Sequence, residues 1–106
     1  MGTPTPKMIS FIIPAYNEEL LIGSTLKALD SAAKTLPEAY ELIVVDDAST
    51  DLTAAVARSA GARIVSVAHR QIAATRNSGA REAKGDVIIF VDADTLANAN
   101  VVQAAV

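Results

Sequence analysis

Residues 87–94 read Val-Ile-Ile-Phe-Val-Asp-Ala-Asp, so five consecutive apolar residues run directly into a pair of aspartates. A strand that is apolar at every position is typical of the centre of a parallel sheet, where both faces are covered. Shorter runs rich in β-branched and other apolar residues predict the remaining strands of this sheet. These runs lie at residues 10–13, 42–45 and 63–67.

A helix is expected after each of the first three strands, because apolar and small residues recur there at helical spacing. The first helix is expected to have Asn17 as its N-cap, Glu18 and Glu19 in its first turn, and Pro37 as its end. The second and third helices are expected at 52–59 and 71–84.

The ends of these two helices are also predicted by the sequence. Ser49 or Thr50 is the expected cap of the second helix, since short hydroxyl side chains accept hydrogen bonds from the first-turn N–H groups. Gly85 is the expected end of the third helix. Gly79 lies inside that helix, where glycine costs about 1 kcal/mol relative to alanine. Close packing of the helix on the sheet is the expected reason for this glycine.

The alternation of strands and helices predicts an α/β fold, with a mostly parallel sheet of about four strands and helices on both faces. In such Rossmann-like sheets, ligands bind beyond the carboxyl ends of the strands, where the strand order reverses. Residues 9–106 are expected to form this single domain, with a last helix starting near Asn98. Residues 1–8 are expected to form a flexible tail.

Composition excludes several classes of protein. The chain has 106 residues and a net charge of −3, and it offers no basic stripe that could neutralise a nucleic-acid backbone. The absence of cysteine excludes disulfides and thiolate metal sites. No segment has the pattern of a signal peptide or the length of a membrane span, so we expect a cytoplasmic domain, with any membrane association belonging to a longer protein.

Asp92 and Asp94 are the candidate metal ligands. Residues two apart after a strand can point the same way, and two neighbouring carboxylates repel each other unless a cation or hydrogen bonds compensate them. Oxygen ligands select Mn²⁺ or Mg²⁺, and such ions commonly share phosphate oxygens of a substrate. An isolated Asp-x-Asp more often forms a turn or a helix cap, but its position directly after an apolar strand favours the metal site.

Asp46 and Asp47 end another strand at the same predicted edge. Adjacent side chains diverge, so we expect one of them to accept a hydrogen bond from a nucleobase or ribose and the other to cap the next turn. The alternative is that both serve only as turn residues. Tyr16 is either a base-stacking residue or a packing residue, and Glu18 either contacts a ligand or is only a helix-start charge.

Two arginines are candidate contacts for a pyrophosphate, because guanidinium groups are always charged and fork-shaped. They are Arg70 and Arg76, and for Arg76 a salt bridge to a nearby aspartate is an equal alternative. A glycine-rich dinucleotide loop, a P-loop, a serine elbow and a cysteine nucleophile are all absent from the sequence. Phosphate binding would therefore depend on a metal and on cationic side chains.

With these motifs in place, the sequence resembles a family 2 glycosyltransferase of the GT-A fold. The resemblance rests on five fragments in order, which cover most of the chain: 12–18, 44–51, 74–80, 85–86 and 90–94. It implies transfer of a sugar from a nucleoside-diphosphate sugar, UDP-sugar being the favoured donor, to an acceptor with inversion at the anomeric carbon.

The resemblance also implies roles for individual residues. Asp94 would be the principal ligand of Mn²⁺ or Mg²⁺, and Asp92 would contact the ribose or the metal. Asp47, with Asp46 as the second candidate, would read the base. The nucleoside pocket would be lined by Pro14, Ala15, Tyr16 and Glu18. A glycine that the family often places before the Ala-Thr-Arg-Asn segment is replaced here by Gln71.

Members of the family continue into a second half that carries the acceptor site and the general base, so we expect both beyond Val106. The sugar or lipid acceptor would bind through that half, and the edge of an incomplete sheet would favour self-association. The alternatives are a non-catalytic nucleotide-binding module and a sugar nucleotidyltransferase, which would carry a Gly-rich, Arg-containing loop where Pro14 to Glu18 stand. A response-regulator-like domain would need a lysine at the end of a late strand, and no predicted strand ends on one.

Overall fold

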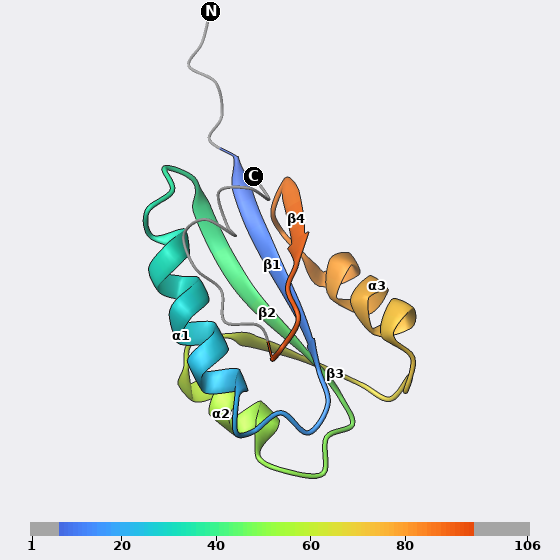
Figure 1. Cartoon of the computed structure of the whole chain (residues 1–106). Helices are drawn as coiled ribbons and strands as arrows, with labels where there is room; N and C mark the ends of the chain where they lie inside the picture. Colours follow the sequence, from blue (N-terminus) through green and yellow to red (C-terminus); the bar gives the residue numbers. More distant parts are fainter. Residues whose placement is uncertain (1–6, 95–106) are drawn as a thin grey trace, which may run out of the picture.

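The computed structural model describes residues 7–94, which form four strands alternating with three helices (Figure 1). The order along the chain agrees with the predicted order of elements. The elements are β1 (Met8–Ala15), α1 (Ile22–Ala33), β2 (Ala39–Asp47), α2 (Thr53–Ser59), β3 (Arg63–Val67), α3 (Ile72–Glu82) and β4 (Val87–Phe90).

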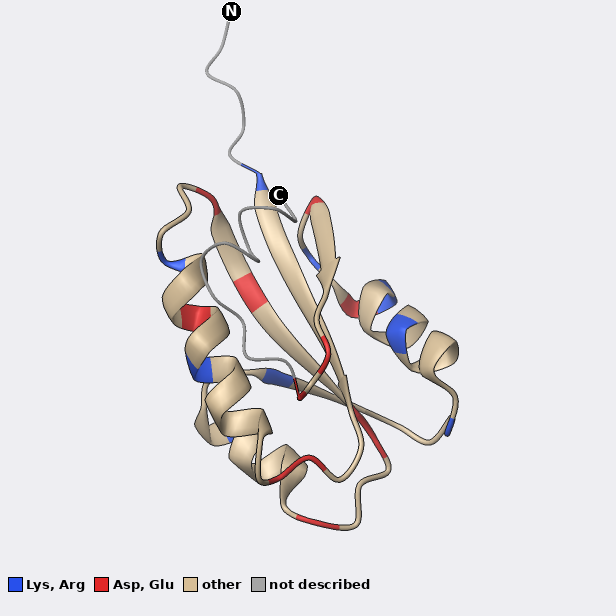
Figure 2. Ribbon diagram, viewed as in Figure 1, with Lys and Arg blue, Asp and Glu red and all other residues tan. Residues whose placement is uncertain are grey.

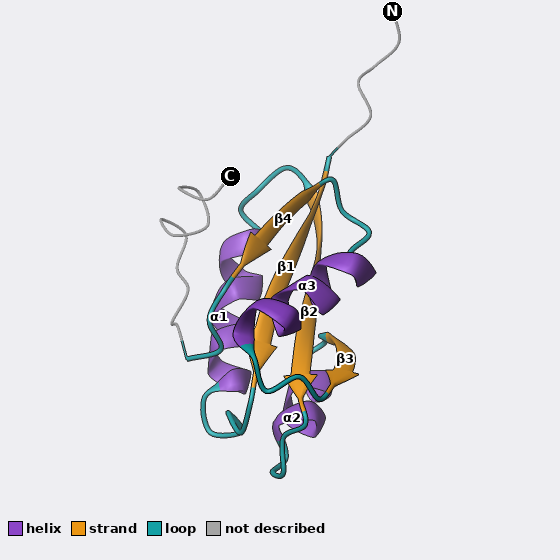
Figure 3. Ribbon diagram, turned by 90° about the vertical axis from the view of Figure 1, so that its right-hand side faces the viewer, coloured by secondary structure: helices purple, strands orange, loops and turns teal. Residues whose placement is uncertain are grey.

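The four strands form one sheet in the order β3-β2-β1-β4, and every neighbouring pair is parallel. Charged side chains lie mostly on the helices and loops around this apolar sheet (Figure 2). Helices α1 and α2 cover one face of the sheet and α3 covers the other (Figure 3). The predicted α/β fold class is therefore confirmed. The strand order reverses between β1 and β4, because the chain leaves β1 toward β2 and β3 and then returns to the other side of β1.

The larger core lies between the sheet and the helices α1 and α2. Phe11 and Ile13 of β1 and Val44 of β2 are fully buried there against Leu26 and Leu29 of α1. Burying a side chain of this size stabilises the fold by about 1.5–3 kcal/mol. The helical stripe that the sequence predicted for α1 is thus the surface that holds the helix on the sheet.

The second core, under α3, is thin because this helix approaches the sheet closely. A Cβ atom on Gly79 would lie 2.5 Å from Cγ2 of Ile12 and 2.6 Å from Cγ2 of Val45. Only glycine leaves room for these two strand residues. The packing reason predicted for Gly79 agrees with this geometry, and the glycine allows α3 to lie close to β1 and β2.

The prediction of a central strand at 87–91 is wrong for this chain. Strand β4 ends at Phe90 and, within residues 7–94, forms an edge of the sheet that is paired with β1 alone. Ile88 is 40% exposed and Phe90 is 45% exposed. Val87 and Ile89, which alternate with them, face the α1 layer and pack against the larger core. Helix α3 lies mainly over β1 and β2, so within residues 7–94 the other face of β4 is only partly covered, with Arg76 near the Phe90 ring.

The first helix begins later than the sequence predicted, and Asn17 does not cap it. Helix α1 starts at Ile22 without a side-chain cap. Asn17 has a positive φ of 51°. Its side-chain oxygen accepts a hydrogen bond from Thr50 N–H at 2.8 Å, in the loop after β2. The amide that could have capped α1 is therefore used to hold two loops together.

The second helix also begins differently. Helix α2 starts at Thr53, and neither Ser49 nor Thr50 caps it. Instead the Asp51 carboxylate accepts a hydrogen bond from the Thr53 N–H at 2.9 Å. The Ser49 hydroxyl accepts one from the Asn17 N–H at 2.9 Å. The hydroxyl and carboxylate groups of this loop thus stabilise the loop itself and its neighbour.

The third helix ends at Glu82, so Gly85 is not its end. Gly85 lies instead where the chain passes against β1, and a Cβ atom there would lie 2.6 Å from the Ser10 hydroxyl and 2.7 Å from the Met8 carbonyl. Its N–H donates to the Ser10 hydroxyl at 2.8 Å. The glycine is needed for close approach of two backbones.

The predicted tail at 1–8 overlaps the first strand, because β1 already begins at Met8. The helix expected near Asn98 lies outside the described residues. Within residues 7–94, the helices are all too short or too polar to cross a lipid bilayer.

Candidate donor-binding site

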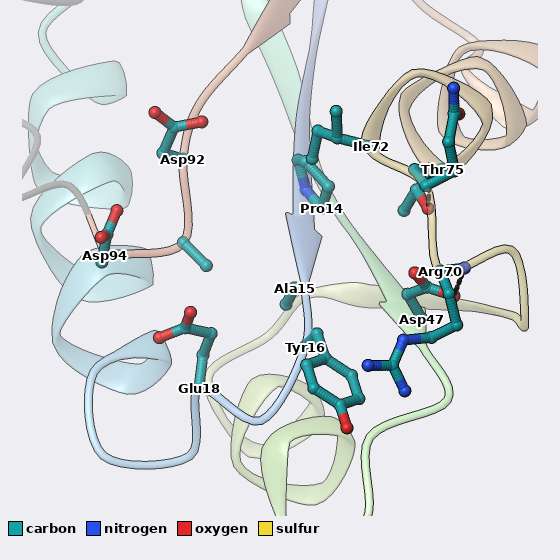
Figure 4. A pocket seen from close by; sticks show the side chains of 12 residues that line it. Pro14, Ala15, Tyr16, Glu18, Asp47, Arg70, Ile72, Thr75, Asp92 and Asp94 are labelled. Atoms are coloured by element: carbon teal, nitrogen blue, oxygen red, sulfur yellow. Dashed lines mark hydrogen bonds between the residues drawn. The ribbon is translucent and has the colours of Figure 1, made fainter.

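A pocket of about 500 Å³ lies at the carboxyl edge of the sheet, where the strand order reverses between β1 and β4 (Figure 4). Open α/β sheets bind their ligands at this place. The loops after β1, β3 and β4 and the last residue of β2 all contribute to it. Its lining residues are Pro14, Ala15, Tyr16, Glu18, Asp47, Arg70, Gln71, Ile72, Thr75, Asp92, Ala93 and Asp94.

The end of β1 divides this pocket into two sides. Figure 4 shows Asp92, Asp94 and Glu18 on one side of Pro14 and Ala15. Tyr16, Arg70 and Asp47 lie on the other side (Figure 4). The first side is acidic, and the second combines an aromatic ring, a guanidinium group and a carboxylate.

The two aspartates after β4 are held by the residue between them. Ala93 is 5% exposed, and its carbonyl accepts a hydrogen bond from the Thr25 hydroxyl of α1 at 2.7 Å. The Val91 N–H still bonds to the Ile12 carbonyl of β1 at 3.0 Å, so the chain follows β1 beyond the end of the strand. With Ala93 anchored inward, Asp92 and Asp94 both line the pocket, as their spacing predicted.

Two carboxylates do not complete a cation site alone. Among residues 7–94 there is no group of three or more His, Cys, Asp or Glu side chains placed to hold a metal ion. The side chain of Asp92 is 64% exposed, so its oxygens are accessible. An exposed pair of oxygen ligands fits Mn²⁺ or Mg²⁺ when phosphate oxygens and waters supply the other ligands.

Arg76 is paired with this acidic side from outside the pocket. Its guanidinium lies 3.6 Å from the Asp92 carboxylate and 5.7 Å from the centroid of the Phe90 ring. The salt bridge that the sequence left as an alternative is thus present. Arg76 is absent from the lining of the pocket within the described part of the chain.

Asp46 and Asp47 diverge, as adjacent residues on a strand must. Asp46 Oδ1 accepts a hydrogen bond from the Ser49 N–H at 3.2 Å, so it caps the turn after β2. Asp47 instead lines the pocket. Its Oδ1 accepts hydrogen bonds from the His69 N–H at 2.7 Å and the Arg70 N–H at 3.0 Å.

These contacts determine the charge of Asp47. Burial raises the pKa of this carboxyl, but hydrogen bonds from the N–H groups of Arg70 and His69 and from the Thr75 side chain, together with the charge of Arg70, lower it by more. The pKa is therefore below its ordinary value. Asp47 is therefore ionised at neutral pH and can only accept hydrogen bonds. A ligand group beside it must be a donor.

The loop after β1, which carries pocket residues, is joined to the loop after β2 by hydrogen bonds that the sequence did not reveal. The Glu18 N–H donates to the Thr53 hydroxyl at 2.8 Å, and the Glu19 N–H donates to the Asp51 carboxylate at 3.3 Å. With the Asn17 contacts, these bonds fix the loop after β1 to the loop after β2. The positions of Tyr16 and Glu18 in the pocket depend on this connection.

The start of α3 supplies lining residues that sequence reasoning missed. Gln71 is the N-cap of this helix, and its side-chain oxygen accepts a hydrogen bond from the Ala74 N–H at 2.6 Å. Ile72 and Thr75 follow it along the pocket wall. The only signal in the sequence was their place, directly after the third predicted strand and therefore at the carboxyl edge.

Comparison with known proteins agrees with this fold. The family model of glycosyl transferase family 2 matches residues 10–106. Validoxylamine A glucosyltransferase of Streptomyces hygroscopicus subsp. limoneus is 36% identical over 104 residues, which cover 92% of this chain. The chain spans only 22% of the length of that relative.

Solved structures give the same result. Glucosyl-3-phosphoglycerate synthase from Mycobacterium tuberculosis, in complex with Mn²⁺, UDP and glucosyl-3-phosphoglycerate, has a TM-score of 0.76 at 30% identity, covering 92% of this chain and 37% of its own. The mannosyltransferase PcManGT from Pyrobaculum calidifontis, in complex with GDP-Man and Mn²⁺, has a TM-score of 0.81 at 28% identity, covering 95% of this chain and 31% of its own.

The sheet order, the pocket at the strand reversal, and the match to the family model over nearly the whole chain lead to one assignment. This chain belongs to glycosyl transferase family 2 and has the α/β fold of the GT-A type.

Proposed function

We propose that this domain binds a nucleoside-diphosphate sugar, with UDP-sugar the favoured donor, and that the whole protein transfers the sugar to an acceptor hydroxyl with inversion. The observation that carries this proposal is the placement of Asp47 and the pair Asp92 and Asp94 on opposite sides of one pocket. One side offers an acceptor for base N–H groups, and the other offers oxygen ligands for a cation. A nucleoside diphosphate with its metal ion matches both sides, because its base carries N–H donors and its phosphates hold the cation.

On the nucleoside side, Asp47 accepts a hydrogen bond from the base, and Tyr16 provides a flat surface for stacking. Pro14 and Ala15, at the end of β1, form the floor between base and diphosphate. This assignment is supported by the ionised state of Asp47, since the N3–H of uracil and the N1–H of guanine are both donors. UDP is the first choice, and GDP is the alternative because PcManGT was solved with GDP-Man.

On the acidic side, Asp94 is the principal ligand of Mn²⁺ or Mg²⁺, and Asp92 contacts the same ion or the ribose. The bound cation would stabilise the negative charge on the departing diphosphate. Both structural relatives described above contain Mn²⁺, which supports this choice of metal. Arg76 holds Asp92 in place and adds positive charge near the phosphates.

We propose that a longer protein supplies the acceptor side of the reaction. In an inverting transfer, the acceptor oxygen bonds to the anomeric carbon opposite the diphosphate, and a base takes the hydroxyl proton. We place this general base and the binding site for the sugar or lipid acceptor beyond Val106. The length of the glucosyltransferase relative, of which this chain spans 22%, supports that placement.

The same comparison favours a second candidate, a nucleotide-binding module without transferase activity of its own. Such a module would bind donor at the same pocket but would neither transfer nor hydrolyse the sugar. Incubating this chain with UDP-sugar and Mn²⁺ and measuring released UDP separates the two candidates.

We also propose that the chain interacts with a second copy through the edge of β4, because unpaired strand edges associate readily.

Calorimetric titration with UDP and with GDP, with and without Mn²⁺, tests the donor site. We expect UDP to bind more tightly in the presence of Mn²⁺, and Asp94→Ala to weaken that binding by more than about 10-fold, since even indirect losses at metal sites cost this much. Asp86→Ala is the control, because this exposed aspartate lies before β4 at the opposite edge of the sheet. Equal UDP affinity with and without Mn²⁺, in the wild type and in Asp86→Ala, would reject the metal site.

A further inference from the structure

The stacking surface proposed for the nucleobase is already covered in this structure. The guanidinium carbon of Arg70 lies 3.9 Å from the centroid of the Tyr16 ring. Both residues line the pocket, and Tyr16 is 37% exposed. Figure 4 shows the guanidinium between the Tyr16 ring and Asp47.

The backbone of Arg70 is fixed although its side chain is exposed. Its φ is 53°, a conformation that costs most residues other than glycine about 1–3 kcal/mol. The Arg70 N–H and the adjacent His69 N–H both donate to Asp47 Oδ1, at 3.0 Å and 2.7 Å, and these bonds hold the strained backbone. The long side chain therefore starts from a fixed point beside Asp47 and extends across Tyr16.

The guanidinium of Arg70 occupies one face of the Tyr16 ring. Carbon atoms in contact are about 3.5–4.0 Å apart, so a guanidinium at 3.9 Å is in direct contact with the ring. A base that stacks on this face and bonds to Asp47 must therefore displace the guanidinium. The displaced group stays charged, because arginine does not deprotonate in proteins.

We propose that Arg70 takes the place of the nucleobase in the free protein and turns to the phosphates of the donor when the base enters. This inference rests on the proposed function, since it concerns the same pocket. Binding of the base alone is then opposed by loss of the Tyr16–Arg70 contact. Binding of a nucleoside diphosphate recovers that loss, because the released guanidinium forms charge-assisted hydrogen bonds to phosphate oxygens. Arg70 thus favours phosphorylated nucleotides over free nucleosides.

Arg70→Gly and Arg70→Asn test this proposal, because both residues tolerate a positive φ and keep the backbone N–H that Asp47 needs. Arg81→Asn is the matched control, an exposed arginine in the last turn of α3 outside the pocket. The affinities of uridine and of UDP are measured for each variant of the 106-residue chain, both with saturating Mn²⁺.

We expect uridine to bind about two- to fivefold more tightly to both Arg70 variants, as an exposed cation–π contact no longer competes. UDP should bind more weakly, so that its preference over uridine falls by about tenfold or more. The control should match the wild type for both ligands. Equal changes for uridine and UDP, in either direction, or no change in either affinity, overturn the proposal. If neither ligand binds the wild-type chain, the proposed function fails as well, and this inference fails with it.

Discussion

At the scale of single residues, Asp47 connects the pocket to the loop after β3. It ends β2, and one of its oxygens holds the N–H groups of His69 and Arg70 at 2.7 Å and 3.0 Å. The same carboxylate borders the pocket. Removing its charge should therefore change both the stability of the fold and the binding of a donor.

The acid sensitivity of the fold should depend on Asp47. Its pKa is lowered in the folded protein, so below about pH 4, the ordinary range of aspartate, the unfolded chain binds more protons than the folded chain. The free energy of unfolding should therefore fall as the pH drops from 5 to below 4. We expect Asp47→Asn to lower it by about 1–3 kcal/mol at pH 7 and to flatten this dependence. Urea denaturation at a series of pH values measures both effects.

Glu82→Gln provides the control for this comparison, because Glu82 is exposed at the end of α3 and lies outside the pocket. Its pH profile should run parallel to that of the wild type. If the profile of Asp47→Asn is equally parallel, the hydrogen bonds to His69 and Arg70 do not stabilise the ionised form of Asp47.

Residue-level features were only partly predictable. The sequence showed that Asp46 and Asp47 would have different roles, because adjacent side chains diverge, and it favoured Asp47 for the base. The turn-capping role of Asp46 required the geometry of Ser49. The positive φ of Arg70 could not be predicted from the sequence, since a residue other than glycine gives no signal of that conformation.

At the scale of elements, the strands were predicted well where apolar β-branched runs had clear ends. Strand β3 has the predicted bounds, Arg63–Val67. The caps predicted for α1 and α2 were wrong, because capping residues near a helix can be used by a neighbouring loop instead. Asn17 and Thr50 bond to each other across two loops, a contact between positions 33 residues apart that no local pattern contains.

Strand β4 shows the limit of reading burial from composition. Its sequence is apolar on both faces, which predicts a covered central strand, but only the face toward α1 is packed in the described chain. Ile88 and Phe90 remain exposed beside an unpaired strand edge. Such an edge lacks the lysine or proline that commonly prevents association.

Self-association through this edge should be visible in solution. We expect sedimentation equilibrium to show a concentration-dependent dimer or larger species for the wild type. Ile88→Lys should shift this equilibrium toward monomer, because a charge would have to be buried in the contact. Leu20→Lys is the matched control, as Leu20 is 90% exposed in a loop away from β4. A wild type that stays monomeric at high concentration, or equal effects of the two substitutions, contradicts the role of β4.

At the scale of the whole molecule, the position of the site follows from topology. The order β3-β2-β1-β4 places the reversal between β1 and β4, and residues at or after the ends of all four strands meet there. The sequence therefore located the carboxyl edge and most of its polar residues without knowing their distances. It could not give the strand order, which decides that β1 separates the acidic side from the nucleoside side.

Paramagnetic broadening of backbone amide signals by Mn²⁺, measured on the ¹⁵N-labelled chain in the presence of UDP, tests directly whether the cation binds beside Asp94. We expect the strongest broadening at Asp92–Asp94 and Glu18, with little at Asp86 on the opposite edge of the sheet. UDP with Mg²⁺ should shift the signals of Asp47 and Arg70, and Asp94→Ala should abolish the Mn²⁺ effect. Broadening centred away from the carboxyl ends of β1 and β4, or unchanged by Asp94→Ala, would contradict a metal site at these aspartates.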